Sequence, residues 1–389
     1  MSGRDADLSA QASALTESPR HMARDDERVR DGSLVSDYEY ELPSGRIARY
    51  PTERRDQSQL LVVPRDGGPF AHRRFSDLVD LLSPGDVFVV NESRVRPARL
   101  LGRKPTGAPS EVLLVRPWVG ESVPDGEDLD HDDTDEPTLW EALVRPGGKL
   151  KPGRVVNIAP GFDVEVVDSA PGGGRVVRLL VQGSVREALE KHGHVPLPPY
   201  LERDDEPFDR ERYQTVYARV PGSVAAPTAG LHFTPHLLDT IEAKGVRRVA
   251  VNLDVGVGTF RPVEANDPDE HDMHSERYFV PAEAVGVINA AREEGRRIWA
   301  VGTTVVRTLE SAARDGVVGE GAGVTELFVH PPYRFRVVDG LITNFHLPRS
   351  TLLMLVAAFT GYERTMEAYS VAISEGYRFY SYGDAMVVG

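Results

Sequence analysis

The pattern of hydrophobic and polar residues differs between two parts of this chain. Between residues 96 and 195, short apolar-rich runs at 111–116, 139–144, 155–158, 164–167 and 176–181 are separated by turns rich in Gly, Pro and Asp. Runs of that length and spacing predict a small all-β barrel or sandwich. Residues 184–192 then read as one short helix.

From residue 197 onward, helical and strand patterns alternate. Thr234 and Pro235 have the character of an N-cap and a first-turn proline, and Gly245 has that of a helix end. We expect further helices over 281–294 and 350–359, and strands over 247–253 and 298–301. The chain is therefore predicted to be an α/β protein, with a main domain over 34–95 and 196–389 and an inserted all-β domain over 96–195.

Two stretches lack any periodic pattern. Residues 1–33 are polar and rich in Arg, Asp and Ser, which predicts a disordered tail. Residues 119–137 carry nine acids and no Lys or Arg, which is typical of a solvated loop. The formal net charge of the whole chain is −15. Without the −9 of this loop and the −2 of the tail, the rest of the chain has a net charge of −4. A nearly balanced body can present a local basic face, so RNA binding is permitted.

Composition excludes several chemistries and compartments. The chain has no cysteine, so it holds no disulfide, no thiolate nucleophile and no cysteine-ligated zinc or iron–sulfur cluster. No apolar run reaches about 18 residues, and the amino terminus has no apolar core of a signal peptide. We expect a cytoplasmic, monomeric enzyme without membrane contact, metal or cofactor.

Three Gly- and Thr-rich segments, 221–234, 255–260 and 300–310, are candidates for ligand contact. Glycine lets a backbone approach a ligand closely, and helix-terminal N–H groups favour anions. Each segment taken alone is better explained as a tight turn that packs a helix on a strand. None matches a GxGxxG, Walker or GxSxG pattern, so neither a dinucleotide nor an ATP site nor a serine hydrolase is indicated.

Ionisable and aromatic residues gather in three further places. His271, His274 and Glu276 lie close in sequence, and they fit acid/base work or substrate hydrogen bonding, a structural role, or least well a metal site. In 343–355, Ser350 or Thr351 can cap the helix that follows. The aromatic residues of 377–386 suit stacking on a base or a sulfonium cation, or an ordinary core.

Taken in chain order, these motifs resemble the S-adenosylmethionine:tRNA ribosyltransferase-isomerase family of queuosine biosynthesis. The resemblance runs from Tyr40 to Val388. It also includes the stretches NESRVRPAR at 91–99, WEALVRPG at 140–147, PLPPY at 196–200 and YQTVYA at 213–218. It implies a barrel-like mixed α/β main domain carrying an inserted β-barrel.

The resemblance also implies a reaction. The ribosyl part of S-adenosylmethionine would be transferred and isomerised onto preQ1 at the wobble position of a tRNA, giving epoxyqueuosine, adenine and methionine. S-Adenosylmethionine is then a consumed substrate and not a cofactor. Two alternatives stay open at this point: a paralogue that binds RNA without chemistry, and an enzyme that cleaves S-adenosylmethionine on another acceptor.

Candidate residues follow from the same motifs. For proton transfer, with a carboxylate partner, they are His232, His271, His274, His346 and Asp384. For the nucleoside or methionyl end they are Thr228, Gly258, Thr259, Gly302, Thr303 and Thr304. For stacking they are Phe233, Phe345 and Tyr382, and for phosphate or carboxylate they are Arg94, Arg99 and Arg307. Gln59, Asp254 and Pro332 stand where the family usually has other residues, and the acidic loop is longer than expected.

Overall fold

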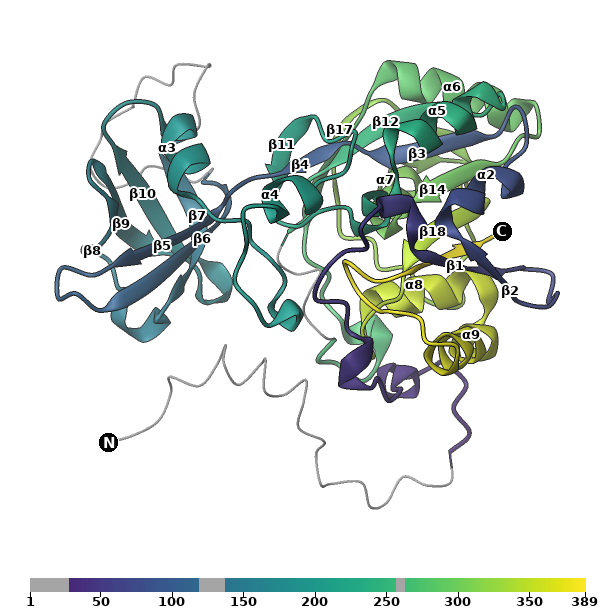
Figure 1. Ribbon diagram of the computed structural model, residues 1–389, viewed down its shortest axis with the longest axis horizontal. Coiled ribbons are helices and arrows are strands. Elements are labelled where there is room, and N and C mark those ends of the chain that lie inside the picture. The colour runs from purple at the N-terminus through teal and green to yellow at the C-terminus, as the bar shows by residue number, and fades with distance from the viewer. Residues whose placement is uncertain (1–27, 119–136, 257–262) are drawn as a thin grey trace. The chain divides into compact units, whose positions relative to one another are not determined.

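The computed structural model describes residues 28–118, 137–256 and 263–389, which form two compact units (Figure 1). One unit holds residues 95–197 and 204–210, and the other holds 28–94, 198–203 and 211–389, within those described ranges. Most of the predicted disordered tail and the acidic loop at 119–136 lie outside the described residues. Within the described part of the chain, no helix has both the length and the apolar character needed to cross a bilayer.

The larger unit is built on a nine-stranded mixed sheet. Its central strands β12, β3, β14 and β18 run parallel to one another, while β19 pairs antiparallel with β18 and parallel with β1. The order across the sheet is β17 (Gly321–Thr325), β13 (Glu276–Val280), β12 (Arg247–Leu253), β3 (Val87–Asn91), β14 (Ile298–Val301), β18 (Gly340–Asn344), β19 (Ala385–Val388), β1 (Gln59–Val63) and β2 (Ala71–Arg74).

This topology brings distant parts of the chain to one edge of the sheet. The carboxyl ends of the four parallel strands share that edge, and the amino ends of β19 and β1 lie there too because these two strands run the opposite way. The segments that follow Leu253, Val301 and Asn344, and those that precede Gln59 and Ala385, therefore converge. In open α/β sheets, ligands bind at the carboxyl ends of the strands.

Local sequence signals account for the helices. Thr234 accepts from the amide of Leu237 at 3.1 Å and caps α5 (Pro235–Ala243), as predicted. The expected helices and strands at 184–192, 247–253, 281–294, 298–301 and 350–359 are confirmed. The other α-helices of the described residues are α2 (Leu78–Leu81), α3 (Val185–His192), α4 (Asp209–Arg212), α6 (Ala282–Glu293), α7 (Thr303–Ala312), α8 (Thr351–Thr360) and α9 (Tyr362–Ser374).

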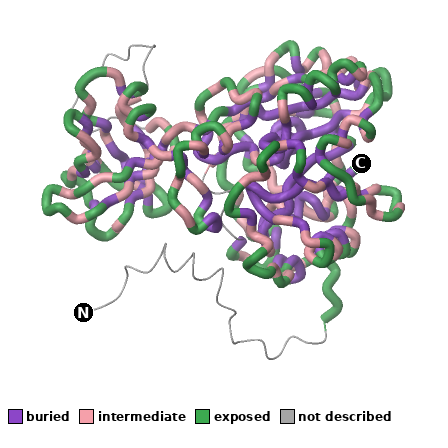
Figure 2. The backbone as a smooth tube through the Cα atoms, in the orientation of Figure 1, coloured by how far each residue is buried: buried purple, intermediate pink, exposed green. Residues whose placement is uncertain are grey.

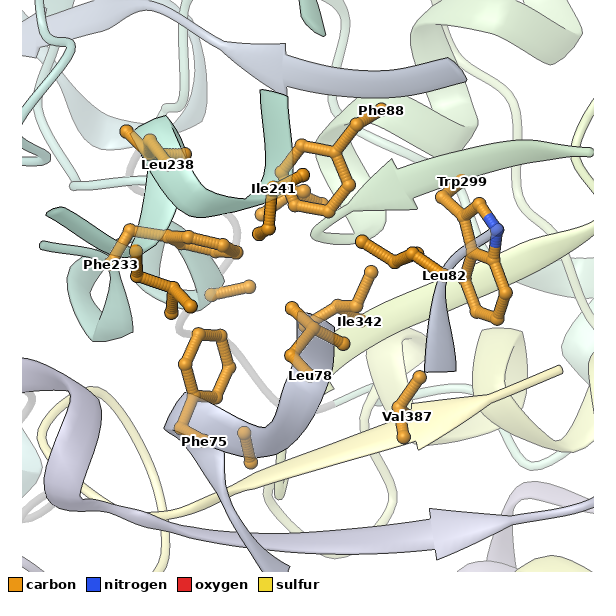
Figure 3. Packing of buried hydrophobic residues seen from close by; sticks show 14 of the residues in the cluster. Phe75, Leu78, Leu82, Phe88, Phe233, Leu238, Ile241, Trp299, Ile342 and Val387 are labelled. Carbon is orange, nitrogen blue, oxygen red and sulfur yellow. The ribbon is translucent and has the colours of Figure 1, made fainter. Parts of the chain in front are cut away.

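The strands at the centre of the main sheet are among the most buried parts of the chain (Figure 2). All five residues of β3 and all four of β14 are buried, as expected for parallel strands covered on both faces. On one face, Phe88, Trp299 and Ile342 from three strands belong to one apolar cluster with Phe233 and Ile241 (Figure 3). This cluster packs α2, α5 and the short 3₁₀ helix Thr228–His232 against the sheet. The packing thereby fixes the position of the 3₁₀ helix relative to the edge of the sheet.

Trp299 packs where a glycine leaves room on the neighbouring strand. A Cβ added at Gly340 would lie 2.3 Å from Cε3 of Trp299, whose indole N–H donates to Oδ2 of Asp86 at 3.0 Å. Gly340→Ala should lower the free energy of unfolding by about 1–3 kcal/mol through overpacking. Gly286→Ala is the matched control, because its Cβ meets nothing and alanine favours helix α6, which should stabilise by about 1 kcal/mol. Urea unfolding that ranks G340A at or above G286A would contradict this packing.

The smaller unit is a closed antiparallel barrel of six strands. Their order around the barrel is β10 (Arg175–Val181), β7 (Leu139–Arg145), β6 (Pro109–Pro117), β5 (Arg99–Arg103), β8 (Arg154–Ala159) and β9 (Phe162–Ser169). Alternate residues such as Trp140, Ala142 and Val144 fill the interior. The run Arg-Leu-Leu-Gly-Arg of β5 was not among the predicted strands.

The predicted fold class, a mixed α/β domain with an inserted small β-barrel, is confirmed. Only the inserted unit closes on itself: the described strands of the main sheet form an open order from β17 to β2, so that sheet is not itself a closed barrel. Two short strand pairs complete the described fold: β4 (Ser93–Val95) with β11 (Val220–Ser223), and the antiparallel pair β15 (Ala313–Arg314) with β16 (Val317–Val318).

Candidate active site

A cavity lies at the edge of the main sheet where the segments converge. Its walls come from residues 225–229, 302–304 and 343–347, together with Tyr200, Val255, Tyr380 and Ser381. Its largely apolar walls with a few polar groups are typical of small-molecule sites. Thr228, Gly302, Thr303, Thr304, Phe345 and His346, six of the predicted site residues, line this one cavity.

Helix α7 begins at the cavity wall. Gly302, at φ 89°, precedes the helix, and its own N–H donates to the carbonyl of Ile342 at 2.8 Å. Within the described residues, no side chain caps this helix, so the amides of its first turn keep their hydrogen-bonding capacity. Helix α8 is different, because Ser350 accepts from the amide of Leu353 at 3.2 Å. The start of α7 is therefore the wall better suited to an anionic group.

His232 is held in a buried network beside the cavity. Nδ2 of Asn344 lies 3.1 Å from the carbonyl oxygen of Tyr380 and 3.0 Å from Nε2 of His232. An amide nitrogen only donates, so Nε2 accepts, and Nδ1 carries the proton and donates to Oγ of Ser58 at 2.7 Å. The ring stacks on Phe75, with 4.8 Å between centroids. Both ring nitrogens are engaged, which makes His232 a positioning residue in this state.

Asn344 presents its other amide atom without a partner. Its Oδ1 is buried and accepts no hydrogen bond within the described part of the protein, and the residue is 2% exposed. Asn344 lines this cavity, whereas His232 lines a smaller neighbouring one. A buried acceptor without a donor costs free energy. A ligand N–H group would satisfy it.

His346 lies in the cavity wall itself. Its Nε2 is 2.7 Å from Oγ1 of Thr343, and its main chain is held by the hydroxyls of Tyr369, at 3.0 Å from the amide nitrogen, and of Tyr40 on the carbonyl oxygen. Burial lowers the pKa of His346 to about 3. Burial, and then the positive charges of Arg378 and Arg55, lower the pKa of His232 to about 3 as well. Both imidazoles are therefore neutral near pH 7.

These two pKa values predict a pH-dependent stability. Unfolding returns both histidines to a pKa near 6.5, so below that pH the unfolded state binds more protons and stability falls as the pH falls towards 3. We expect the free energy of unfolding to drop by roughly 2–3 kcal/mol per pH unit below about pH 6. In urea titrations, His346→Gln should remove about half of this slope. An equal slope in wild type and H346Q would contradict the assignment.

The other two histidines lie outside the cavity walls. His271 packs edge-on against Phe328, with 5.4 Å between centroids, and His274 is exposed. The segment between them is neither strand nor helix, so neither periodicity considered from the sequence applies. Glu276 opens β13 and turns inward. Among the described residues, no group of three His, Asp or Glu side chains forms a metal-binding cluster.

Asp384 does not pair with a histidine, contrary to its predicted role. Its carboxylate accepts from the main-chain amides of Gln59, at 2.9 Å, and Arg378, at 2.7 Å, and the side chains of both residues also reach it. The residue is 1% exposed. Asp384 therefore ties the start of β1 to the loop before β19. Gln59 keeps a contact to it at 3.4 Å without adding a charge.

Two of the three predicted arginines are committed to carboxylates. Arg307 forms a buried ion pair with Glu276 and donates to the carbonyl of Leu327 at 3.0 Å, which corrects its assignment to a ligand anion. Arg99 lies in the barrel unit and pairs with Glu111 at 3.2 Å and Asp204 at 3.3 Å. Arg94 is exposed on β4. The carboxylates that neutralise these two arginines lie outside the motifs that contain them, 12 to 105 residues away, so the motifs alone did not reveal them.

The predicted stacking residues are mostly core. Phe233 is fully buried, and its ring contacts those of Phe75 and Phe88, so no face is left for a base. Phe345 borders the cavity, but its ring packs on Phe379 at 4.9 Å. Tyr382 lines the smaller cavity.

Gly258 and Thr259 lie outside the described residues. Tyr200, Asn344 and Ser381, all in the cavity wall, were not singled out from the sequence. The hydroxyl of Tyr200 is 2.6 Å from that of Ser381, and burial raises the pKa of Tyr200. Of these three residues, Tyr200 could have been found from the sequence, because it ends the PLPPY stretch that the family resemblance includes.

Fold and cavity together define an α/β enzyme domain whose small-molecule site lies at the carboxyl edge of its parallel strands. Comparison with known proteins narrows this class. The family described as "Queuosine biosynthesis protein" matches residues 35–388. An S-adenosylmethionine:tRNA ribosyltransferase-isomerase of Thermus thermophilus is 53% identical over 362 residues, which are 90% of this chain and 98% of that protein.

A protein of the same name from Moorella thermoacetica is 51% identical over 358 residues, 91% of this chain and 99% of its own. A crystal structure of an S-adenosylmethionine tRNA ribosyltransferase from Thermotoga maritima shares 36% identity. The match covers 90% of this chain and 99% of the Thermotoga maritima chain, with a TM-score of 0.49. The chain belongs to the S-adenosylmethionine:tRNA ribosyltransferase-isomerase family of queuosine biosynthesis.

Proposed function

We propose that the protein transfers and isomerises the ribosyl group of S-adenosylmethionine onto preQ1 at the wobble position of a tRNA. Adenine and methionine are released, and epoxyqueuosine remains in the tRNA. The observation that carries this proposal is the family match over residues 35–388, which spans every segment that lines the cavity. We further propose that the protein acts as a monomer in the cytoplasm, where its tRNA substrate is found.

The reaction sets three demands on the site. The sulfonium of S-adenosylmethionine acidifies the C5′ hydrogens, so a base must remove one to give an ylide-like carbon. Loss of adenine needs a donor near its ring nitrogens. Both steps need orientation and exclusion of water. His346 is the neutral imidazole in the cavity wall, and a neutral ring offers one nitrogen as acceptor and one as donor.

The start of α7 suits the methionyl end of the substrate. Its first-turn amides lack a side-chain cap within the described residues, and Thr303 and Thr304 add hydroxyls at the same place. A carboxylate placed there gains hydrogen bonds from the amides and a favourable interaction with the helix dipole. Thr228 and Gly302 complete this wall of the cavity.

Asn344 suits an N–H group of the substrate. Its amide nitrogen is committed to Tyr380 and His232, so its orientation is set, and only Oδ1 remains to accept. Adenine and the deazaguanine base both carry an amino group that can donate to such an oxygen. We therefore assign Asn344 to recognition of a purine-like ring, with His232 and Ser58 as positioning residues behind it.

A product assay tests the proposed function. The protein is incubated with preQ1-containing tRNA and S-adenosylmethionine, and the digested tRNA is analysed by mass spectrometry. We expect epoxyqueuosine in the tRNA, with adenine and methionine in equal amounts in solution. Free preQ1 in place of the tRNA is the control substrate. Turnover on free preQ1 alone would contradict the tRNA assignment, and no adenine release from either substrate would contradict the reaction.

A further inference from the structure

We propose that residues 145–154 of the barrel, called here the basic loop, bind the phosphate backbone of the tRNA. The loop leads from the end of β7 to the start of β8 and reads RPGGKLKPGR. It lies in the unit that does not contain the cavity. The identity of the RNA as tRNA rests on the proposed function, whereas the phosphate chemistry rests on the loop itself.

The loop concentrates exposed positive charge. Arg145, Lys149, Lys151 and Arg154 lie within ten residues that contain no Asp or Glu, and all four are exposed. Buried Leu150, between the two lysines, anchors the loop to the barrel interior. Cations spaced along an exposed loop are the arrangement that contacts successive phosphates.

Within the described part of the chain, no carboxylate neutralises these four cations, in contrast to Arg116 and Arg178 of the same barrel. Arg116 pairs with Glu141 at 2.7 Å, and Arg178 lies 3.7 Å from Glu165. Glu111 stands directly opposite Arg145 in the β6–β7 register, but its carboxylate is bound by Arg99. The charge of the basic loop is therefore available to a partner.

One side chain holds the backbone of the loop in place. Arg175, on β10, donates from Nε to the carbonyl of Leu150 at 2.8 Å and from Nη2 to that of Gly147 at 2.9 Å. The amides of Lys149 and Leu150 both donate to the carbonyl of Pro146 at 3.2 Å. A preorganised backbone lowers the ordering cost of binding, since only the side chains of the four cations remain to be immobilised.

A charge-matched pair of variants tests the basic loop. Lys149→Gln with Lys151→Gln removes two charges from the loop, and Lys104→Gln with Lys191→Gln removes two charges from elsewhere on the same unit. Affinity for preQ1-tRNA is measured by filter binding at several salt concentrations, and the KM for S-adenosylmethionine is measured alongside. Thermal unfolding checks that both variants keep the wild-type fold.

We expect the loop variant to bind tRNA at least tenfold more weakly, with the slope of log affinity against log salt reduced by roughly one to two. Its KM for S-adenosylmethionine should stay at the wild-type value, and the control variant should bind tRNA like wild type. Equal losses in both variants, or unchanged binding in the loop variant, would overturn the inference. If tRNA binds through the loop but no epoxyqueuosine forms, the inference stands and the proposed reaction fails.

Discussion

Replacing Arg307 by methionine should lower the free energy of unfolding by about 3–5 kcal/mol, the loss typical of breaking a buried ion pair from one side. The side chains of Arg307 and Glu276 are 8% and 6% exposed, so the substitution leaves a carboxylate buried without its counter-charge. Glu276 also accepts from the amide of Gly256 at 3.1 Å, and Arg307 reaches the carbonyls of Leu327 and Thr325. Denaturant unfolding measures the loss.

The double variant Arg307→Met with Glu276→Leu is the internal control. Apolar residues of similar volume remove both charges together, so we expect the double variant to recover most of the stability lost in R307M. The pair joins α7 to β13, and α7 begins at the cavity wall, so R307M should also raise the KM for S-adenosylmethionine. A loss below about 1 kcal/mol in R307M would show that the pair is not buried as described.

Replacing Asn344 by alanine should lower kcat/KM for preQ1-tRNA by about 10²-fold or more. The variant removes the acceptor assigned to a substrate N–H group and frees Nε2 of His232 from its donor. In a site built to hydrogen-bond its substrate, an unpaired polar group lowers kcat/KM far more than the loss of a methylene does. Steady-state kinetics with both substrates varied gives the value.

Asn289 provides the matched control for Asn344. Its side chain bridges the amide and carbonyl of Val318 on β16, at 3.0 Å and 2.9 Å, and it is not among the residues that line the cavity. Asn289→Ala should therefore lose stability but keep the wild-type kcat/KM. If N344A and N289A lose stability alike and both keep full activity, Asn344 is a structural residue only.

Much of the architecture was predictable from local sequence. The caps Thr234 and Ser350 and the turn glycines Gly245 and Gly361 delimit helices, because capping is a local hydrogen-bond problem. The apolar-rich run at 139–144 between turn-rich segments predicted a barrel strand, which is β7 in the structure. The strand β5 escaped prediction because its five residues include two arginines and a glycine.

The site was only partly predictable. The Gly- and Thr-rich segment at 302–304 and the segment around His346 were recognised from the sequence, and the sheet brings them to one cavity. Asn344, one residue after Thr343 at the end of β18, has no local feature that marks its function. Its role depends on Tyr380 and His232, which are 36 and 112 residues away.

The sequence by itself therefore determined many of the helices and strands, the inserted barrel and the family, because periodicity, caps and ordered motifs are properties of neighbouring residues. Only the tertiary structure decided which ionisable groups are available for chemistry. Arg307, Asp384 and Phe233 were reasonable site residues by type, and each is committed elsewhere: to Glu276, to the amides of Gln59 and Arg378, and to the core. The role of a buried charge or ring depends on the partner that the fold places beside it, and that partner can be hundreds of residues away in the sequence.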